Sequence, residues 1–516
     1  MQDTTSNNKR IAKNTIMLYI RMFISMVVGL YTSRVVLATL GVEDYGIYGV
    51  VGGVVAMMGF LNASMSGATS RFLTFELGRG DKDRLAKTFS SALIVHIAIA
   101  IIVFILAETV GLWFLCNKLN IPEGRMEAAH WVYQFSILAT MLSITQVPYN
   151  ATIIAHEKMD VYAYMEILNV TLKLLIVYLL TIGDFDKLKL YAVLTFAVSL
   201  IIMMIYRIYC LRNFKESRFH WVWDKTYLTP LLSFSGWSIY GDIAYTVRQQ
   251  GANFLLNIFI GPVINAANML GSTIQGLLMG FSSNIVMAFK PPIIKKYATA
   301  NFADFNKLIN LSVKAAQILL FIFTIPTLFL TKFILQFWLG QVPEGAIVIT
   351  RLCLLVNIFA STNAVLLTAI QASGNIMKSS FICGTLYLLS IPTMYVFLKL
   401  GYGYEVCYWI IVAISFVFVI INSFLLKKNT PEFKISHFYF ATFGRLIFLG
   451  VVSFLLIYQI KDAFNDNFTS FVAILLLNTM IIVTLSFILV FDAQERASII
   501  LFVKKKYQDG IANQNN

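Results

Sequence analysis

Long apolar runs alternate with short polar connections along almost the whole chain. A helix rises 1.5 Å per residue and the hydrocarbon core of a bilayer is about 30 Å thick, so about 20 consecutive apolar residues predict a transmembrane helix. We count about fourteen such runs. The predicted spans are 14–38, 46–68, 89–115, 129–152, 161–182, 189–210, 230–259, 263–289, 311–335, 346–370, 380–399, 405–426, 441–460 and 469–491.

The basic residues test this count, because bacterial membrane proteins collect Lys and Arg on the cytoplasmic side. With a cytoplasmic N-terminus, the connections and tails on that side carry 26 Lys and Arg, whereas the opposite ends carry seven. This bias favours an even number of spans. It predicts a multi-pass protein of the bacterial inner (cytoplasmic) membrane with both termini in the cytoplasm. The first apolar run is too long for a signal peptide and is expected to be an uncleaved span.

Composition narrows the class of protein further. The chain of 516 residues is 58% hydrophobic and 13% charged, with a mean hydropathy of +0.74, which no ordinary soluble domain shows. The net charge of +14 does not indicate nucleic-acid binding, because no connection is long enough to form a domain. The sequence has no P-loop and no cluster with metal-ligand spacing. We therefore expect no cofactor, no nucleic-acid partner and no enzymatic activity.

An internal repeat organises the chain. Pro-Glu-Gly at 122–124 recurs at 343–345, Leu40-Gly41 recurs as Ile260-Gly261, and the segment 155–158 corresponds to 372–375, at offsets of 221, 220 and 217. Each repeat holds six helices, an even number, so both share one orientation and their pseudo-twofold axis lies along the membrane normal. The predicted domains are an N-terminal lobe at 1–210, a cytoplasmic linker at 211–229, a C-terminal lobe at 230–426, an appended helix pair at 427–491 and a cytoplasmic tail at 492–516.

Two apolar runs carry a polar stripe on one helical face. In the span 230–259 the stripe comprises Ser235, Ser238, Asp242, Tyr245, Thr246, Gln249, Asn253 and Asn257, with Arg248 at its edge. In the span 14–38 it comprises Asn14, Arg21, Ser25 and Thr32. Adding 221 to these four numbers gives four members of the first stripe. Lipid penalises such faces, so we expect both stripes to line one cavity between the repeats.

Basic residues within the spans indicate what this cavity binds, because a buried charge in a membrane is costly. Lys314, Arg351 and Arg445 lie near span ends and are expected to reach the interface. Lys173 and Arg248 lie near mid-span and are expected to face the cavity, and an ion pair with Glu166 on the same helix is the alternative explanation for Lys173. Arg21 and Arg34 fit a position in the cavity and one at the interface equally well. A basic cavity with few acids favours an anion such as a phosphate or diphosphate. The candidate substrate-binding residues are Arg21, Arg34, Lys173, Asp242, Arg248, Gln249 and Asn253.

Two junctions resemble those of a known family. The segment 33–48, Ser-Arg-Val-Val-Leu-Ala-Thr-Leu-Gly-Val-Glu-Asp-Tyr-Gly-Ile-Tyr, resembles the junction of the first two helices in bacterial polysaccharide flippases of the Wzx (O-antigen) type. The segment 148–159, Pro-Tyr-Asn-Ala-Thr-Ile-Ile-Ala-His-Glu-Lys-Met, resembles their junction of helices four and five. The short loops and the six-plus-six repeat extend the resemblance over the whole chain.

The resemblance implies an all-α fold like that of multidrug extruders and lipid II flippases, working by alternating access. It implies that an oligosaccharide linked to undecaprenyl diphosphate is moved from the cytoplasmic to the periplasmic leaflet. The implied product is O-antigen, capsule or exopolysaccharide, and the implied partners are this lipid-linked cargo, membrane lipids and polymerase or assembly proteins. In such proteins intramembrane arginines meet the diphosphate or acidic sugars, a role that we carry to Arg21, Arg34 and Arg248 as an expectation.

Alternative functions remain on the same fold. A cation-coupled drug extruder would carry acids on the first helix, but the sequence has none between Asn14 and Leu40. A lipid II flippase would share the undecaprenyl diphosphate and differ in its sugars. A membrane enzyme of polysaccharide assembly would need a larger outer domain than the short loops provide. We expect coupling to a proton or sodium gradient, with Asp242 as the candidate coupling residue.

Overall fold

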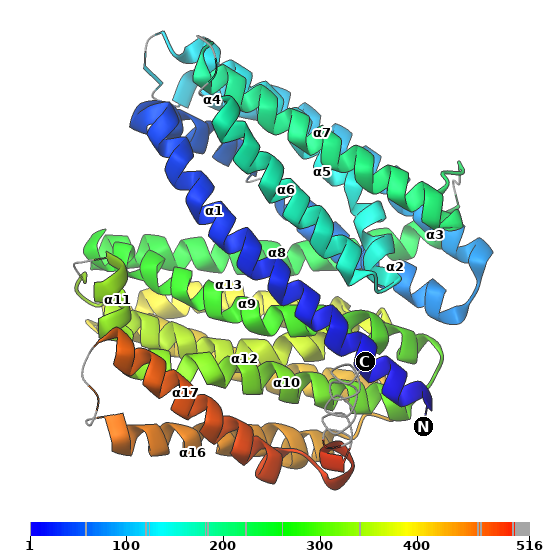
Figure 1. The fold of residues 1–516 in the computed structure, drawn as a ribbon, viewed down its shortest axis with the longest axis vertical. Coiled ribbons are helices and arrows are strands. Elements are labelled where there is room, and N and C mark those ends of the chain that lie inside the picture. Colours follow the sequence, from blue (N-terminus) through cyan, green and yellow to red (C-terminus); the bar gives the residue numbers. More distant parts are fainter. Residues whose placement is uncertain are drawn as a thin grey trace, which may run out of the picture. The chain divides into compact units, whose positions relative to one another are not determined.

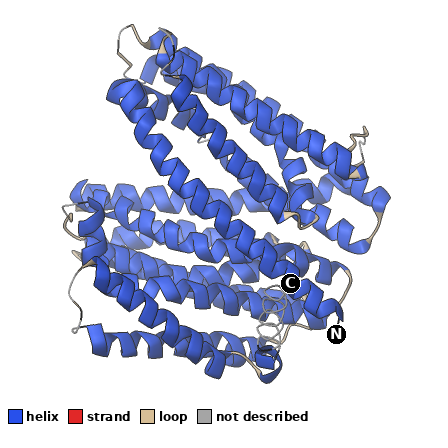
Figure 2. Cartoon of the chain, viewed as in Figure 1, coloured by secondary structure: helices blue, strands red, loops and turns tan. Residues whose placement is uncertain are grey.

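The computed structural model describes residues 2–497 and 500, except 57–58, 119–120, 123, 181, 183–184, 222–223, 261, 340–341, 462–463 and 465–466. All its regular elements are helices (Figure 2), as the all-α prediction required. In chain order they are α1 (Gln2–Ala56), α2 (Gly59–Arg79), α3 (Lys82–Leu106), η1 (Ala107–Gly111), α4 (Leu112–Lys118), α5 (Met126–Ala155), α6 (Met159–Leu179), α7 (Lys187–Asn213), η2 (Lys215–Ser217), α8 (Lys225–Phe259), α9 (Pro262–Ala298), α10 (Phe302–Phe329), α11 (Thr331–Leu339), α12 (Ala346–Ser373), α13 (Met377–Lys399), α14 (Glu405–Asn429), α15 (Ile435–His437), η3 (Phe438–Phe443), α16 (Gly444–Ile460), α17 (Phe468–Leu485) and η5 (Ser486–Val490). Figure 1 labels most of the α-helices.

Helices cover the predicted spans, and their boundaries follow local chemistry. Asp81, Asp186 and Asn467 each accept hydrogen bonds from backbone N–H groups of the first turn of α3, α7 and α17. The expected loop around Leu40-Gly41 is instead a kink. Gly41 adopts φ 82° and ψ 169°, and helix continues on both sides of it within α1. A glycine can occupy this region of backbone space because it lacks a Cβ atom.

Twelve helical segments of the described chain are long and apolar enough to cross a membrane. The predicted spans 46–68 and 230–259 are not among them. The second of these carries the polar stripe, which lowers its hydropathy. Large apolar side chains nevertheless face outward along the other helices, among them Ile105, Phe448 and Leu476, each more than half exposed. This combination marks a multi-pass membrane protein, because only lipid makes such exposure favourable.

The chain divides into two compact units. Unit 1 comprises Met1–Val247, Met287–Phe302 and Thr368–Leu386, and unit 2 comprises Arg248–Val286, Ala303–Leu367 and Tyr387–Asn516. The helices α8, α9, α12 and α13 each continue from one unit into the other. The predicted lobe boundaries at 210 and 230 stay a prediction.

In unit 1, α5 packs against α7, α2, α3 and α1, and α1 runs beside α6 (Figure 1). Its largest core cluster includes Leu73, Phe89, Tyr149 and Ile176, all almost fully buried. In unit 2 a core cluster joins α8, α9, α12, α13 and α14, and α16 packs against α17. Each unit therefore buries its own apolar core.

The repeat predicted from sequence reappears in the backbone. Gly124 and Gly345, which end the two Pro-Glu-Gly segments, both adopt left-handed conformations with φ 88° and 77°. At the second pair of junctions, Glu157 has φ 59° and Gly374, at the same offset of 217, has φ 80°. Positive φ is uncommon and costs free energy for any residue except glycine. Its recurrence at matched positions shows that both copies use the same turn geometry.

The two repeat glycines provide a stability test with an internal control. A Cβ at Gly345 would lie 2.6 Å from Cδ1 of Ile264 and 3.1 Å from the Tyr404 hydroxyl, whereas a Cβ at Gly124 would meet nothing within 4 Å. Gly124→Ala should destabilise by about 1–2 kcal/mol through backbone strain alone. Gly345→Ala should cost at least about 1 kcal/mol more through overpacking. Thermal unfolding in detergent measures both, and equal losses would show that the Ile264 contact is unimportant.

Candidate functional site

The polar stripe of α1 is the clearest candidate surface. Asn14, Arg21, Ser25 and Thr32 each carry a buried polar side-chain atom that has no hydrogen-bond partner within the described part of the protein: Nδ2, Nε, Oγ and Oγ1, respectively. These four residues are the stripe that helical periodicity places on one face. Buried polar groups are normally satisfied, and the cost of leaving one without a partner is about 1–3 kcal/mol. A face with four such atoms is suited to partners from outside the chain, either water or a ligand.

Arg21 supplies the charge on this face. It lies near the middle of the apolar segment Ile11–Gly29, and its guanidinium lies 5.0 Å from the ring centroid of Tyr162 in α6. Arg21 and Glu166 both interact electrostatically with Tyr206 of α7. This cation–π contact with Tyr162 stabilises the position of the guanidinium and uses none of its N–H donors. α1, α6 and α7 therefore present one charged donor among tyrosine rings.

In the polar stripe of α8, unlike that of α1, some hydroxyls are hydrogen-bonded within their own helix. Ser235 and Thr246 donate hydrogen bonds of 2.7 and 2.8 Å to the carbonyls of Leu231 and Asp242, four residues earlier in the helix. These two hydroxyls need no cavity to explain them. Asp242 and Gln249 are exposed, so they remain accessible. The α8 stripe thus contains both satisfied hydroxyls and accessible polar groups.

The predicted site residues divide between the two units. Arg21 and Asp242 belong to unit 1, with Lys173, which is exposed on α6. The side chain of Arg34 lies outside the described residues. Arg248, Gln249 and Asn253 belong to unit 2. A binding role for these residues, and a single cavity that unites them, stay predictions.

In unit 2 the polar residues form a connected group. The guanidinium of Arg248 lies 5.3 Å from the ring centroid of Tyr387. The amide of Asn268 donates to Oδ1 of Asn253, and the Tyr408 hydroxyl donates to Oδ1 of Asn268 at 2.7 Å. Asn253 is thus held by α9 and α14 rather than free to rotate. Both units place an arginine of a polar stripe against a tyrosine ring.

Sequence reasoning missed Arg207. It assigned this residue to a cytoplasmic connection, but α7 continues to Asn213 and keeps Arg207 inside a membrane-length helix. Its Nη2 donates to the Thr145 hydroxyl at 3.0 Å, and its guanidinium lies 5.5 Å from the Tyr149 ring centroid. Its Nε is buried without a hydrogen-bond partner among the described residues. The predicted span 189–210 already contains Arg207, so counting it with the spans rather than with the following connection would have revealed it.

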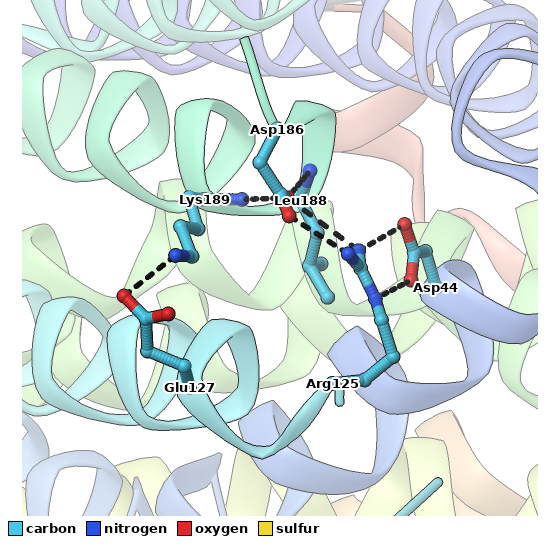
Figure 3. Close-up of polar contacts among 6 residues, drawn as sticks. All are labelled: Asp44, Arg125, Glu127, Asp186, Leu188 and Lys189. Carbon is cyan, nitrogen blue, oxygen red and sulfur yellow. Dashed lines mark hydrogen bonds and ion pairs between the residues drawn. The ribbon is translucent and has the colours of Figure 1, made fainter. Parts of the chain in front are cut away.

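One end of unit 1 is held by an arginine between two aspartates (Figure 3). Arg125, just before α5, donates to both carboxylate oxygens of Asp44 on α1, with Nε to Oδ1 at 2.9 Å. Its Nη1 donates to Asp186 at 2.7 Å, and Asp186 also accepts from the backbone amides of Leu188 and Lys189 at the start of α7. Three helices are thereby tied at one point. In the predicted topology all of these residues lie on the same side of the membrane.

The charges of this group reinforce one another. Burial alone would lower the pKa of Arg125, but the hydrogen bonds and charges of Asp44 and Asp186 outweigh it and raise that pKa. Burial alone would raise the pKa of Asp186, yet hydrogen bonds from the Lys189 amide and from Arg125 hold it below its usual value. A depressed carboxyl pKa contributes stability above about pH 4, and this contribution is lost as the pH falls further.

Comparison with known proteins identifies the family. Residues 11–291, more than half of the chain, match the family described as polysaccharide biosynthesis protein. The chain belongs to this family. No curated protein sequence matches it significantly. Membership in the polysaccharide biosynthesis protein family confirms the resemblance carried by the two junction segments.

Solved structures confirm the fold of this polysaccharide biosynthesis protein. It is similar to crystal structures of MATE in the bent conformation (TM-score 0.73, 13% identity, 83% of this chain and 96% of that chain) and in the straight conformation (0.70, 15%, 83% and 97%). It is also similar to a MOP superfamily transporter from Pyrococcus furiosus (0.69, 15%, 83% and 97%). The likeness to these solved structures shows that the chain has the fold of these transporters.

The Arg125 group predicts a clear difference between two ion pairs. Arg125→Ala leaves two carboxylates, each less than 30% exposed, without their cation and should destabilise the protein by about 1–3 kcal/mol. Lys189→Ala breaks the nearby 2.7 Å pair with Glu127, whose side chain is 75% exposed, and should cost less than about 1 kcal/mol. Thermal unfolding in detergent at neutral pH distinguishes them. Similar losses for both variants would contradict a special role for Arg125.

Proposed function

We propose that the protein moves an oligosaccharide linked to undecaprenyl diphosphate from the cytoplasmic to the periplasmic leaflet of the bacterial inner membrane. The observation that supports this most directly is the face of α1. There Arg21 and three neutral polar residues have buried atoms without hydrogen-bond partners among the residues that the structure describes. Membership in the polysaccharide biosynthesis family favours a saccharide cargo. The lipid part of such a cargo can stay in the bilayer while its polar head crosses.

The chemistry of Arg21 fits a diphosphate. A guanidinium presents several N–H donors in a fixed plane, which match two oxygens of one phosphate group. Nε of Arg21 is one such donor, and the stack on Tyr162 orients it. The amide of Asn14 and the hydroxyls of Ser25 and Thr32 extend along the same face and suit sugar hydroxyls. Arg248, stacked on Tyr387, offers a second guanidinium in unit 2.

The relationship to MATE transporters leaves a drug extruder as the competing function, but the charge on α1 argues against it. A cationic drug requires acids, and the first helix has none between Asn14 and Leu40. The Pyrococcus furiosus transporter is described as having a binding pocket of reversed polarity, which suggested a different function for it. Pocket polarity is therefore a reasonable guide to cargo on this fold.

Complementation tests the cargo. A bacterium that lacks its own O-antigen flippase would receive the wild-type gene, Arg21→Ala or Arg248→Ala, with surface polysaccharide as the readout and a blot for expression. Loss of a charge-assisted hydrogen bond of about 1.5–3 kcal/mol should weaken cargo binding roughly 10- to 100-fold. We expect the wild type to restore polysaccharide, and both variants to be expressed but largely inactive.

Arg84→Ala is the matched control, because this arginine is exposed and pairs only loosely with Asp81 at 3.9 Å. It should restore polysaccharide fully. A wild-type protein that is expressed but restores nothing would contradict this cargo class, and lipid II and drug-transport assays would then follow. Arginine variants as active as the wild type would contradict the binding role of the α1 face.

We further propose that a proton or sodium gradient drives transport through Asp242, an accessible acid on α8. Asp242→Asn removes the titratable group while keeping its size. Transport by the wild type should fall when a protonophore or an ionophore dissipates the gradient, whereas residual transport by Asp242→Asn should not respond. Polysaccharide export followed with and without the ionophore measures this, and an unchanged response in the variant would assign coupling elsewhere.

A further inference from the structure

Four segments meet within unit 1, and they form two pairs in which each segment is the counterpart of the other in the second repeat. They are the C-terminal ends of α2 and α9, which are the second helices of the two repeats, and the junctions α5–α6 and α12–α13, which follow the fourth helices. A Cβ at Gly78 on α2 would lie 3.1 Å from Cβ of Ala298 and 3.1 Å from Cα of Lys295 on α9. The two second helices are therefore in direct contact at this end.

Arg71 of α2 binds the junction of the opposite repeat. Its Nε donates to the carbonyl of Gln371 at 3.0 Å and its Nη2 donates to the carbonyl of Ala372 at 3.2 Å. These carbonyls lie at the end of α12, where the last C=O groups lack intrahelical N–H donors and carry partial negative charge. Arg71 is only 6% exposed and stacks near Phe72, Phe75 and Phe234. A buried cation thus caps a helix of the other repeat.

Gly374 makes this approach feasible. It adopts φ +80°, and a Cβ there would lie 2.6 Å from Nη2 of Arg71. A side chain at this position would meet two obstacles, the left-handed backbone and the close guanidinium. The Arg71 contact is built into the turn that ends α12.

Lys295 of α9 makes the reciprocal contact. Its Nζ donates to Oε1 of Glu157 at 2.8 Å, and the Glu157 side chain is 1% exposed. Glu157 holds the left-handed position of the α5–α6 turn, the counterpart of Gly374. With the repeat offset of 220, Arg71 in the first repeat corresponds to position 291 in the second. Position 291 lies one helical turn before Lys295 on α9. Each repeat therefore sends a cation from its second helix into the junction that follows the fourth helix of the other.

The neighbouring residue strengthens the first of these turns. His156 contacts the Glu216 carboxylate and stacks on Phe214 with ring centroids 4.2 Å apart. Burial would raise the pKa of Glu216, but the hydrogen bond from His156 lowers it. The α5–α6 turn is thus held on one side by its own repeat and on the other by Lys295.

We propose that these two crossed contacts form a releasable latch that closes this end of the transporter, and that it must open for cargo to enter or leave there. Alternating access requires the two repeats to separate at one end while they close at the other. Arg71 and Lys295 are the polar ties that cross between the repeats at this end, where α2 also touches α9. The proposal rests on the transporter fold and not on the lipid-linked cargo.

A disulfide between the second helices of the two repeats reports directly whether the latch is closed. The variant Gly78→Cys with Ala298→Cys places two thiols where Cβ atoms nearly meet, close to the separation that a disulfide needs. In native membranes, oxidation should cross-link this pair rapidly. The single-cysteine variants control for the five native cysteines, of which Cys116 is exposed. Failure of the pair to cross-link under any condition would contradict the closed arrangement.

The cross-linking rate then tests whether Arg71 and Lys295 keep the latch closed. Lys295→Gln and Arg71→Lys, each added to the cysteine pair, should slow cross-linking severalfold because the open arrangement becomes more populated. Asp160→Asn is the matched control. It breaks the 3.2 Å pair with Lys13 within one repeat and should leave the rate unchanged. Unchanged rates in both cation variants, or an equal effect of Asp160→Asn, would overturn the latch.

Transport provides the second readout. The oxidised cysteine pair should stop cargo movement, and a reductant should restore it, because a locked latch prevents opening. Full transport by the cross-linked protein would overturn the proposal. A protein that carries another cargo would still show the cross-linking differences, so the failure of the proposed cargo and the failure of the latch can be distinguished.

Discussion

The requirement that polar groups find partners where water is absent governs this protein. The helices satisfy their own backbone groups, which explains why every described regular element is helical. Each buried polar side chain needs a hydrogen-bond partner as well. Ser235 and Thr246 do so by bonding to their own helix, Asn253 by joining a network with Asn268 and Tyr408, and Arg125 by pairing with two aspartates. On the face of α1, by contrast, four buried polar atoms have no such partner within the described structure.

The same requirement separates two kinds of arginine. Arg71 and Arg125 have their donors directed to fixed carbonyls or carboxylates, so they hold helices together. Arg21 and Arg207 stack on tyrosine rings while Nε of each lacks a partner in the described structure. An arginine that is held in place but keeps N–H donors unbonded within the protein is suited to a transient anionic partner. The anion then displaces water from these donors and breaks no hydrogen bond within the protein. The structural arginines lie at the ends of unit 1, and Arg21 lies within a span.

The internal repeat explains how the contacts of Arg71 and Lys295 can be both specific and reversible. The two repeats use one turn geometry at their fourth-to-fifth helix junctions, with positive φ at Glu157 and Gly374. One junction accepts a cation through a carboxylate and the other through helix-end carbonyls. These two contacts are polar and directional, and both cross from one repeat to the other. A transporter that alternates between states needs ties of this kind, strong enough to close and local enough to release.

Periodicity and charge determined much of this protein from sequence alone. Helices occupy most of the described residues in the predicted apolar runs, and the α1 stripe coincides with atoms that lack partners within the described structure. The repeat offsets found in the sequence relate turns that share a left-handed backbone conformation in the structure. The periodic features are local, since they depend on residues within a few helical turns. The sequence could not show that Arg71 reaches Ala372, that Glu157 meets Lys295, or that Arg207 lies beside Tyr149. Those contacts join residues far apart in the chain, and only tertiary packing decides which of them meet.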